Sequence, residues 1–142
     1  MIRICFVCLG NICRSPMAEF IMKEKLREKN LEENFLIRSK GTSEEEEGND
    51  LYYPAKKVLE EHKIPYSLHQ ASKLKREDLD NFDYFIGMDD SNIKRMKDIL
   101  KDDSKIRKLL PYDIKDPWYT RDFETAYQDI TKGINNLLEN LK

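Results

Sequence analysis

The chain has 142 residues, of which 39% are hydrophobic, 37% charged and 10% aromatic, and its net charge is −2. This length and aromatic content favour one folded domain over a disordered polymer. The charge balance excludes a broad basic footprint for nucleic acid, and no apolar run approaches the ~18 residues of a membrane span.

The first elements predicted from the sequence surround a short loop. Residues 2–7 are apolar and rich in β-branched side chains, which predicts a buried strand, and a glycine turn at Gly10 follows it. Ser15 is predicted as the N-cap of a helix and Pro16 as its first residue. Helical spacing of apolar residues then continues to about Lys29.

Strands and helices keep alternating along the rest of the chain. Further strands are predicted at 35–39, 82–88 and 106–110, and helices at 54–61, 75–81, 89–100 and 123–141. Residues 42–50 and 111–121 are predicted as loops, and residues 44–47 are four consecutive glutamates. Alternation of this kind predicts a single α/β domain, residues 1–142. Its twisted four-stranded parallel sheet should be flanked by helices on both faces.

The three cysteines all lie near the N-terminus. An odd, clustered set predicts no disulfide framework, and without a secretory signal pattern it indicates a cytoplasmic location. A zinc site would need a fourth ligand, and the two histidines, His62 and His69, have no ligand-like spacing, so no metal is expected. Cys5 and Cys8 should point to opposite faces of the strand, so Cys5 is predicted to be a core residue, not half of a redox pair.

The segment from Cys8 to Ser15 follows the first strand and leads into a helix, where parallel sheets bind ligands. Its backbone amides can form an anion-binding nest, and Arg14 can hold two phosphate oxygens. The same positive charge favours the thiolate of Cys8, which predicts attack by sulfur on a phosphate ester. The spacing of Cys8 and Arg14 is weak evidence alone, since an ordinary turn with a buried cysteine has it too.

Phosphoryl transfer also needs an acid that protonates the leaving oxygen. Asp116 stands out because Pro117, Trp118 and Tyr119 follow it in an otherwise polar loop. The proline stiffens this loop, and the aromatic rings can line a cleft. On this pattern alone, a turn with anchoring aromatic residues is the simpler interpretation.

Together these segments resemble a known family. Residues 7–19 (VCLGNICRSPMAE) closely resemble the active-site signature of the low-molecular-weight protein tyrosine phosphatases. Residues 82–84 with 88–92 resemble the central segment of that family, and residues 116–119 resemble its acid loop. The resemblance covers essentially the whole chain, and it implies a small twisted four-stranded parallel sheet with flanking helices.

The resemblance also implies roles for individual residues. Cys8 would be the nucleophile, Arg14 the phosphate clamp, and Asp116 the general acid and then the base. Ser39 and His69 would support the phosphate loop, together with its own residues Asn11 and Ser15. The residues expected to contact substrate are Leu9, Gly10, Asn11, Ile12, Cys13, Ser15, Trp118 and Tyr119.

The expected partners follow from the same resemblance. They are tyrosine-phosphorylated proteins or peptides and tyrosine kinases, in a signalling role. We expect no cofactor, no metal, no nucleic acid and no membrane partner, and a chain that is monomeric or self-associates weakly.

Three other functions compete with this one. A protein-arginine phosphatase on the same scaffold typically has threonine where Ile12 stands, and the isoleucine favours an aryl ester. A phosphotyrosine-binding module without turnover would be expected to lose Cys8 or Asp116, and both are present. An arsenate reductase would need resolving cysteines near the third strand, but no cysteine follows Cys13.

Two stretches depart from the family pattern. Glutamates 44–47 occupy a loop where members usually carry an aromatic residue, and residues 51–54 (LYYP) replace an acidic and arginine-containing stretch. The glutamates predict a preference for basic residues beside the phosphotyrosine, although a charge run of this kind is more often only a solvated loop.

Overall fold

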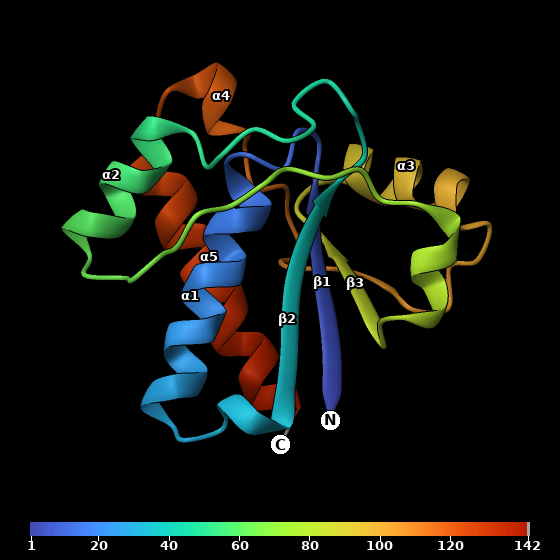
Figure 1. Cartoon of the computed structure of the whole chain (residues 1–142), viewed down its shortest axis with the longest axis horizontal. Coiled ribbons are helices and arrows are strands. Elements are labelled where there is room, and N and C mark those ends of the chain that lie inside the picture. The colour runs from blue at the N-terminus through green and yellow to red at the C-terminus, as the bar shows by residue number, and fades with distance from the viewer. Residues whose placement is uncertain (142) are drawn as a thin grey trace.

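The computed structural model describes residues 1–141, and residue 142 of the predicted domain lies outside the described residues. Its centre is a four-stranded sheet in the order β2-β1-β3-β4 (Figure 1). All neighbouring strands pair in parallel, which confirms the predicted fold class. The strands are β1 (Ile2–Cys8), β2 (Phe35–Gly41), β3 (Tyr84–Gly87) and β4 (Ile106–Lys108).

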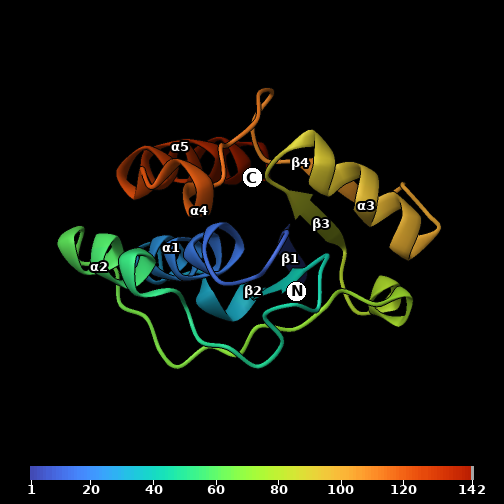
Figure 2. The same ribbon diagram turned by 90° about the horizontal axis from the view of Figure 1, so that it is seen from above.

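Helices cover both faces of this sheet, as Figure 2 shows from above. One face carries α1 (Arg14–Glu28), α2 (Tyr53–Glu61) and α5 (Phe123–Asn140). The other carries α3 (Asp90–Leu100) and a 3₁₀ helix (Arg76–Asp80), which replaces the helix predicted over 75–81. A second 3₁₀ helix (Glu32–Asn34) precedes β2, and the predicted loop 111–121 contains the short helix α4 (Pro117–Thr120).

The alternation of side chains along β1 divides the core in two. Ile4, Phe6 and Cys8 pack in the cluster beneath α1 and α5, whereas Cys5 and Val7 pack in the cluster on the α3 side. All five are buried. Cys5 is therefore a core residue on the face opposite Cys8, as predicted.

The predicted N-terminus of α1 is wrong by two residues. The helix begins at Arg14 with Cys13 at the N-cap position, and no side chain caps it. Ser15 lies inside the first turn because its hydroxyl is engaged elsewhere, 3.1 Å from Cys8 Sγ and 2.8 Å from Asn11 Nδ2. Pro16 still fits, since the first turn of a helix has no partner for the missing N–H.

The third and fourth strands are shorter than predicted. Before β3, the Asp83 N–H still donates to the Arg3 carbonyl (2.8 Å), but the Arg3 N–H donates to the Asp83 carboxylate (2.8 Å) instead of to a backbone carbonyl. After β4, one last bond from the Leu109 N–H to the Gly87 carbonyl (2.9 Å) ends the pairing. β1 and β2 are consequently the longest strands. The phosphate loop follows the carboxyl end of β1, and Gly41 ends β2.

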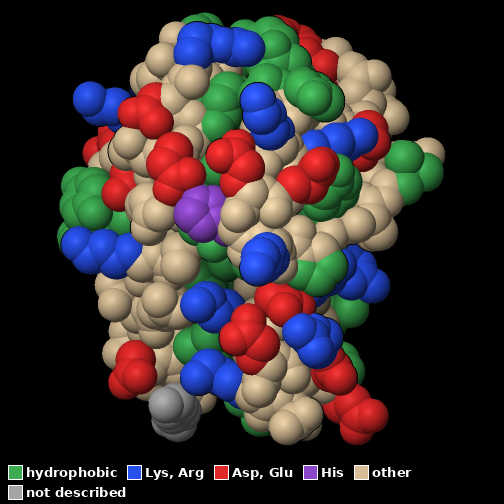
Figure 3. Space-filling model, turned by 90° about the vertical axis from the view of Figure 1, so that its left-hand side faces the viewer, with side chains coloured by type: hydrophobic (Ala, Val, Ile, Leu, Met, Phe, Trp, Pro, Cys, Tyr) green, Lys and Arg blue, Asp and Glu red, His purple; other side chains and the backbone are tan. Residues whose placement is uncertain are grey.

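Two general properties concern the helices and the charge of the surface. Within residues 1–141, no helix has both the length and the apolarity needed to cross a membrane. Acidic and basic side chains are interspersed on the face shown in Figure 3.

Candidate active site

A cavity of about 110 Å³ opens beyond the carboxyl end of β1, between the phosphate loop (residues 8–14) and α4. Figure 1 shows this end of the sheet at the top of the molecule, beside α4. Most of the predicted site residues meet here, although they come from segments about 100 positions apart in the sequence. The cavity is lined by Cys8, Leu9, Gly10, Ile12, Cys13, Ser43, Glu45, Glu46, Asp116, Trp118 and Tyr119.

The sulfur of Cys8 lies at the base of this cavity with only 3% of the residue exposed. The Ser15 hydroxyl is 3.1 Å from it, and the Ser15 backbone N–H donates to it at 3.4 Å. The hydroxyl and the backbone N–H of Ser15, in the first turn of α1, therefore both lie at hydrogen-bonding distance from the sulfur. Burial raises the pKa of the neighbouring Cys13 thiol far above its ordinary value, and the charges of Cys8 and Asp116 add to that rise.

Arg14 is a buried cation beside this sulfur, with 2% of its side chain exposed. Its Nη1 donates to the Asp89 carboxylate and to the Ile114 carbonyl, both at 2.7 Å, and its Nη2 lies 3.4 Å from Asp116 Oδ2. Burial alone would lower the Arg14 pKa, but the charges of Cys8, Asp116 and Asp89 outweigh it and raise that pKa. The guanidinium therefore stays charged.

One donor of this guanidinium is left over. Among the described residues, the buried Nε of Arg14 has no hydrogen-bond partner. Buried polar groups are nearly always paired, so this N–H calls for an acceptor from outside the described residues, such as water or a ligand. An oxygen of a bound phosphate would meet that need.

Asn11, at the turn of the phosphate loop, has a left-handed backbone (φ 59°) and is fully buried. Its side-chain amide donates to Ser15 Oγ (2.8 Å) and Ser39 Oγ (3.1 Å). Its backbone carbonyl accepts from His69 Nε2 (2.7 Å). Ser39 in turn donates to Glu19 at 2.7 Å. The structure thus brings together all four residues expected to hold the loop, and it adds Glu19.

Gly41 also belongs to the loop's support. A Cβ atom there would lie 2.8 Å from the Leu9 carbonyl oxygen and 3.1 Å from Asn11 Cβ. Contacts this short to backbone are not tolerated, so the glycine at the end of β2 is what lets the loop pack against that strand.

Asp116 stands at the opposite wall as the N-cap of α4. Its Oδ1 accepts from the Trp118 N–H (3.0 Å), which leaves Oδ2 directed toward Arg14. Trp118 and Tyr119 line the cavity from α4 and are 40% and 71% exposed. The carboxylate therefore lies at the mouth of the cavity between the buried arginine and two exposed rings.

The acidic loop reaches the cavity with two of its four glutamates. Glu45 and Glu46 line the cavity, and Glu45 is exposed to solvent. Glu46 is half-buried and accepts a hydrogen bond from Asn49 Nδ2 (2.7 Å). Two carboxylates thus border the cavity on the side of this loop.

Asp89 is the closest carboxylate to Arg14, and the sequence patterns assigned it no role in the site. A signal is present, because Asp89 follows the third strand and begins α3 with a reciprocal capping pair, Asp89 and Asn92. In a parallel sheet, a polar residue at that position faces the ligand edge. The capping pattern alone, however, indicates only the start of a helix.

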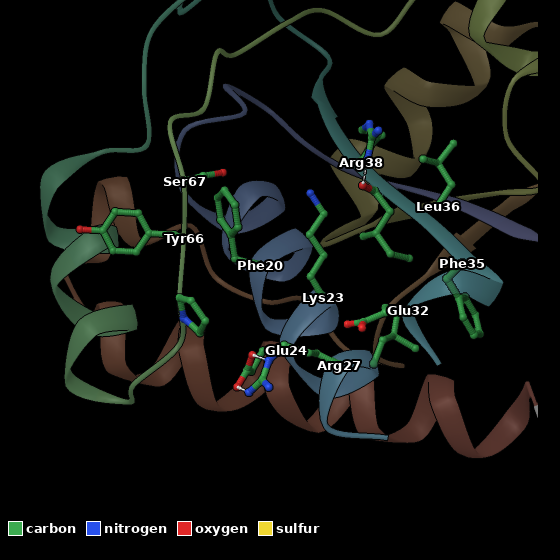
Figure 4. A pocket seen from close by; sticks show the side chains of 13 residues that line it. Phe20, Lys23, Glu24, Arg27, Glu32, Phe35, Leu36, Arg38, Tyr66 and Ser67 are labelled. Atoms are coloured by element: carbon green, nitrogen blue, oxygen red, sulfur yellow. Dashed lines mark hydrogen bonds and ion pairs between the residues drawn. The ribbon is translucent and has the colours of Figure 1, made fainter. Parts of the chain in front are cut away.

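A larger hollow of about 470 Å³ lies elsewhere, between α1, β2 and residues 65–67 (Figure 4). It contains Phe20 and Tyr66, whose rings meet edge to face, and the ion pair of Arg27 with Glu24. None of the three cysteines lines it, whereas Cys8 and Cys13 line the smaller cavity. Within residues 1–141, no group of three or more His, Cys, Asp or Glu side chains is arranged to hold a metal ion.

Comparison with known proteins agrees with this geometry. A model of the family described as "Low molecular weight phosphotyrosine protein phosphatase" matches residues 3–142. A "Low molecular weight protein-tyrosine-phosphatase PtpA" of Staphylococcus aureus (strain MRSA252) is 38% identical and covers 98% of this chain and 93% of its own.

Solved structures are similar over the whole fold. The low molecular weight protein tyrosine phosphatase SP-PTP of Streptococcus pyogenes matches with a TM-score of 0.94 and 40% identity, over 100% of this chain and 94% of its own. A Drosophila arginine phosphatase matches with a TM-score of 0.90 and 27% identity, over 98% and 97% of the two chains.

Proposed function

The chain belongs to the low molecular weight phosphotyrosine protein phosphatase family, and from this premise we propose that Cys8, Arg14 and Asp116 hydrolyse phosphotyrosine through a cysteinyl-phosphate. The observation that carries the proposal is the buried Arg14, whose Nε lacks a partner beside the Cys8 sulfur. A dianionic phosphate supplies both the missing acceptor and a counter-charge for the guanidinium.

In the first step, the Cys8 thiolate attacks phosphorus, a P–S bond forms and the bond to the tyrosine oxygen breaks. Arg14 and the loop amides hold the three equatorial oxygens, where the transition state spreads its charge. Asp116, protonated, gives its proton to the leaving phenolate oxygen. Free tyrosine side chain and a phosphorylated cysteine result.

In the second step, water attacks the phosphorus and Asp116, now ionised, accepts a proton from it. The P–S bond breaks, inorganic phosphate forms and the Cys8 thiolate is released to the two donors of Ser15. The same carboxyl group thus serves as acid and then as base, which its place at the mouth of the cavity permits.

Arginine phosphatase activity is the second candidate, because a Drosophila arginine phosphatase shares this fold. Ile12 lines the cavity, and its apolar side chain favours the ring of phosphotyrosine over the charged guanidinium of phosphoarginine. We expect kcat/KM for a phosphotyrosine peptide to exceed that for a matched phosphoarginine peptide by about tenfold or more. Initial rates of phosphate release decide this, and a preference for phosphoarginine would overturn the proposed substrate.

Glu45 is expected to select basic residues beside the phosphotyrosine. At low ionic strength, kcat/KM should be several-fold higher for peptides with Lys or Arg neighbours than for acidic ones, because the exposed carboxylate attracts cations at short range. Glu45→Gln should reduce that preference, and Glu33→Gln, an exposed carboxylate before β2, should keep it. Equal rates for basic and acidic peptides at low salt would show that Glu45 does not choose substrates.

The finer biological assignments follow from the family and are part of the proposal. Residues 1–142 act as one catalytic domain in the cytoplasm, in signalling, as a monomer or a weakly self-associating chain that counteracts tyrosine kinases. Support comes from the three cysteines, which are all buried free thiols, as suits a reducing compartment.

A further inference from the structure

The acid loop has little packing of its own. Its helix α4 spans only Pro117–Thr120, and of these residues Pro117 alone is buried. A helix of one turn is not stable by itself, so the position of Asp116 at its N-cap must depend on contacts with other segments.

Tyr52, which lies 69 positions before Arg121 in the sequence, supplies those contacts. The centre of its ring lies 4.7 Å from that of Trp118, at an interplanar angle of 51°, and 6.0 Å from that of Phe123. Its hydroxyl accepts a hydrogen bond from Arg121 Nη2 at 2.9 Å. The tyrosine thus contacts α4 at Trp118 and, just after its end, at Arg121.

Arg121 completes the arrangement where α4 ends. Its guanidinium lies 5.3 Å from the centre of the Tyr52 ring and 5.6 Å from that of Phe123, and its Nη1 donates to the Trp118 carbonyl at 3.2 Å. The residue has a left-handed backbone (φ 62°) and ends α4 as its C-cap. One cation therefore joins the tyrosine hydroxyl to the backbone of α4.

Tyr52 is itself fastened to the phosphate loop. Its backbone N–H donates to the Ile12 carbonyl at 2.9 Å, and its own carbonyl accepts from Ala55 and Lys56 at the start of α2. The preceding Leu51 is buried in the main core. The ring is thus held on a backbone that cannot shift without moving the loop around Cys8.

From this chain of contacts we propose that Tyr52 is a positioning residue that sets Asp116 relative to Cys8. This inference rests on the proposed function, since it concerns how the general acid is held. Tyr52, within the segment 51–54 that departs from the family pattern, thus forms an aromatic bridge between the phosphate loop and α4. Misplacing an acid by a fraction of an ångström slows proton transfer and leaves phosphate binding unchanged.

The test compares Tyr52→Leu, Arg121→Met and the control Tyr53→Leu, whose neighbouring tyrosine is 72% exposed. We expect Tyr52→Leu to lower kcat/KM for phenyl phosphate about tenfold and kcat/KM for p-nitrophenyl phosphate much less, because kcat/KM reports the first step and only the poorer leaving group needs a well-placed proton there. Inhibition by inorganic phosphate should not change. Arg121→Met should act in the same direction more weakly, and Tyr53→Leu should match the wild type.

A second readout does not depend on turnover. Trp118 is the chain's one tryptophan, so quenching of its fluorescence by acrylamide should rise in Tyr52→Leu and stay unchanged in Tyr53→Leu. The inference would be overturned if folded Tyr52→Leu, or Arg121→Met, kept both the wild-type quenching and the wild-type ratio of kcat/KM for phenyl phosphate to that for p-nitrophenyl phosphate. An inactive wild type with the expected rise in quenching would instead overturn the proposed function and leave the bridge standing.

Discussion

Replacing Cys8 by serine should lower kcat for phosphotyrosine by about 10⁴-fold or more and leave phosphate binding intact. A serine hydroxyl is a far weaker acid than a cysteine thiol and does not ionise near neutral pH, so the attacking group is lost. Arg14 and the loop amides, which hold the phosphate, are untouched by the change. Binding of phosphotyrosine to Cys8→Ser can be followed by calorimetry and by the emission of Trp118, which lines the same cavity.

The matched control is Cys5→Ala. Cys5 is fully buried on the opposite face of β1, so its removal should lower the thermal midpoint and leave the rate close to that of the wild type. Retention of most activity by Cys8→Ser would contradict a cysteinyl-phosphate. Saturable heat of binding with an unchanged Trp118 emission would contradict the placement of that ring at the substrate.

Replacing Asp116 by asparagine should lower kcat/KM for phenyl phosphate, which reports the first step alone, by about 10² to 10⁴, the usual contribution of a general acid. The amide keeps the size of the side chain, and its oxygen can still cap α4 through the Trp118 N–H, so the loop should keep its position. What the variant lacks is a proton to give to the leaving oxygen. Esters whose leaving groups are already acidic should therefore be slowed much less.

Asp113→Asn is the control for this change. Asp113 lies three residues earlier in the same loop, but its carboxylate pairs with Lys108 (2.7 Å) and accepts from the Asp90 N–H (3.1 Å). We expect it to leave the leaving-group dependence unchanged. An equal loss of kcat/KM for all esters in Asp116→Asn, however large, would contradict the role of Asp116 as the acid.

Several features of the active site could be predicted from the sequence because they depend on neighbours along the chain. The alternation of predicted strands and helices is a local pattern, and it predicted a parallel sheet with helices on both faces. Cys8, Arg14 and Ser15 lie within eight positions after a strand, so their meeting at its end also follows from local structure. The departures from the family pattern at residues 44–47 and 51–54 are likewise properties of the sequence alone.

Errors at the ends of elements have a common physical cause. Ser15 has the sequence signature of an N-cap, yet its hydroxyl binds Asn11 and Cys8, and the helix starts earlier. The strand beginning at Tyr84 is delayed because the Asp83 side chain bonds the backbone of Arg3, 80 positions away. Both outcomes are competitions for a hydrogen-bonding group, which local propensity does not record.

By itself, the sequence predicted the parallel fold, the position of the phosphate loop and the presence of Cys8 and Arg14 in that loop, since each depends on short spacing. Only the tertiary structure decided what surrounds them. Asp89 meets Arg14 across 75 positions, and Tyr52 meets Arg121 across 69. Contacts of such separation form when whole elements pack, and many sequences with the same local patterns would pack different side chains there. Burial of Arg14 and placement of Asp116 are thus properties of the assembled core.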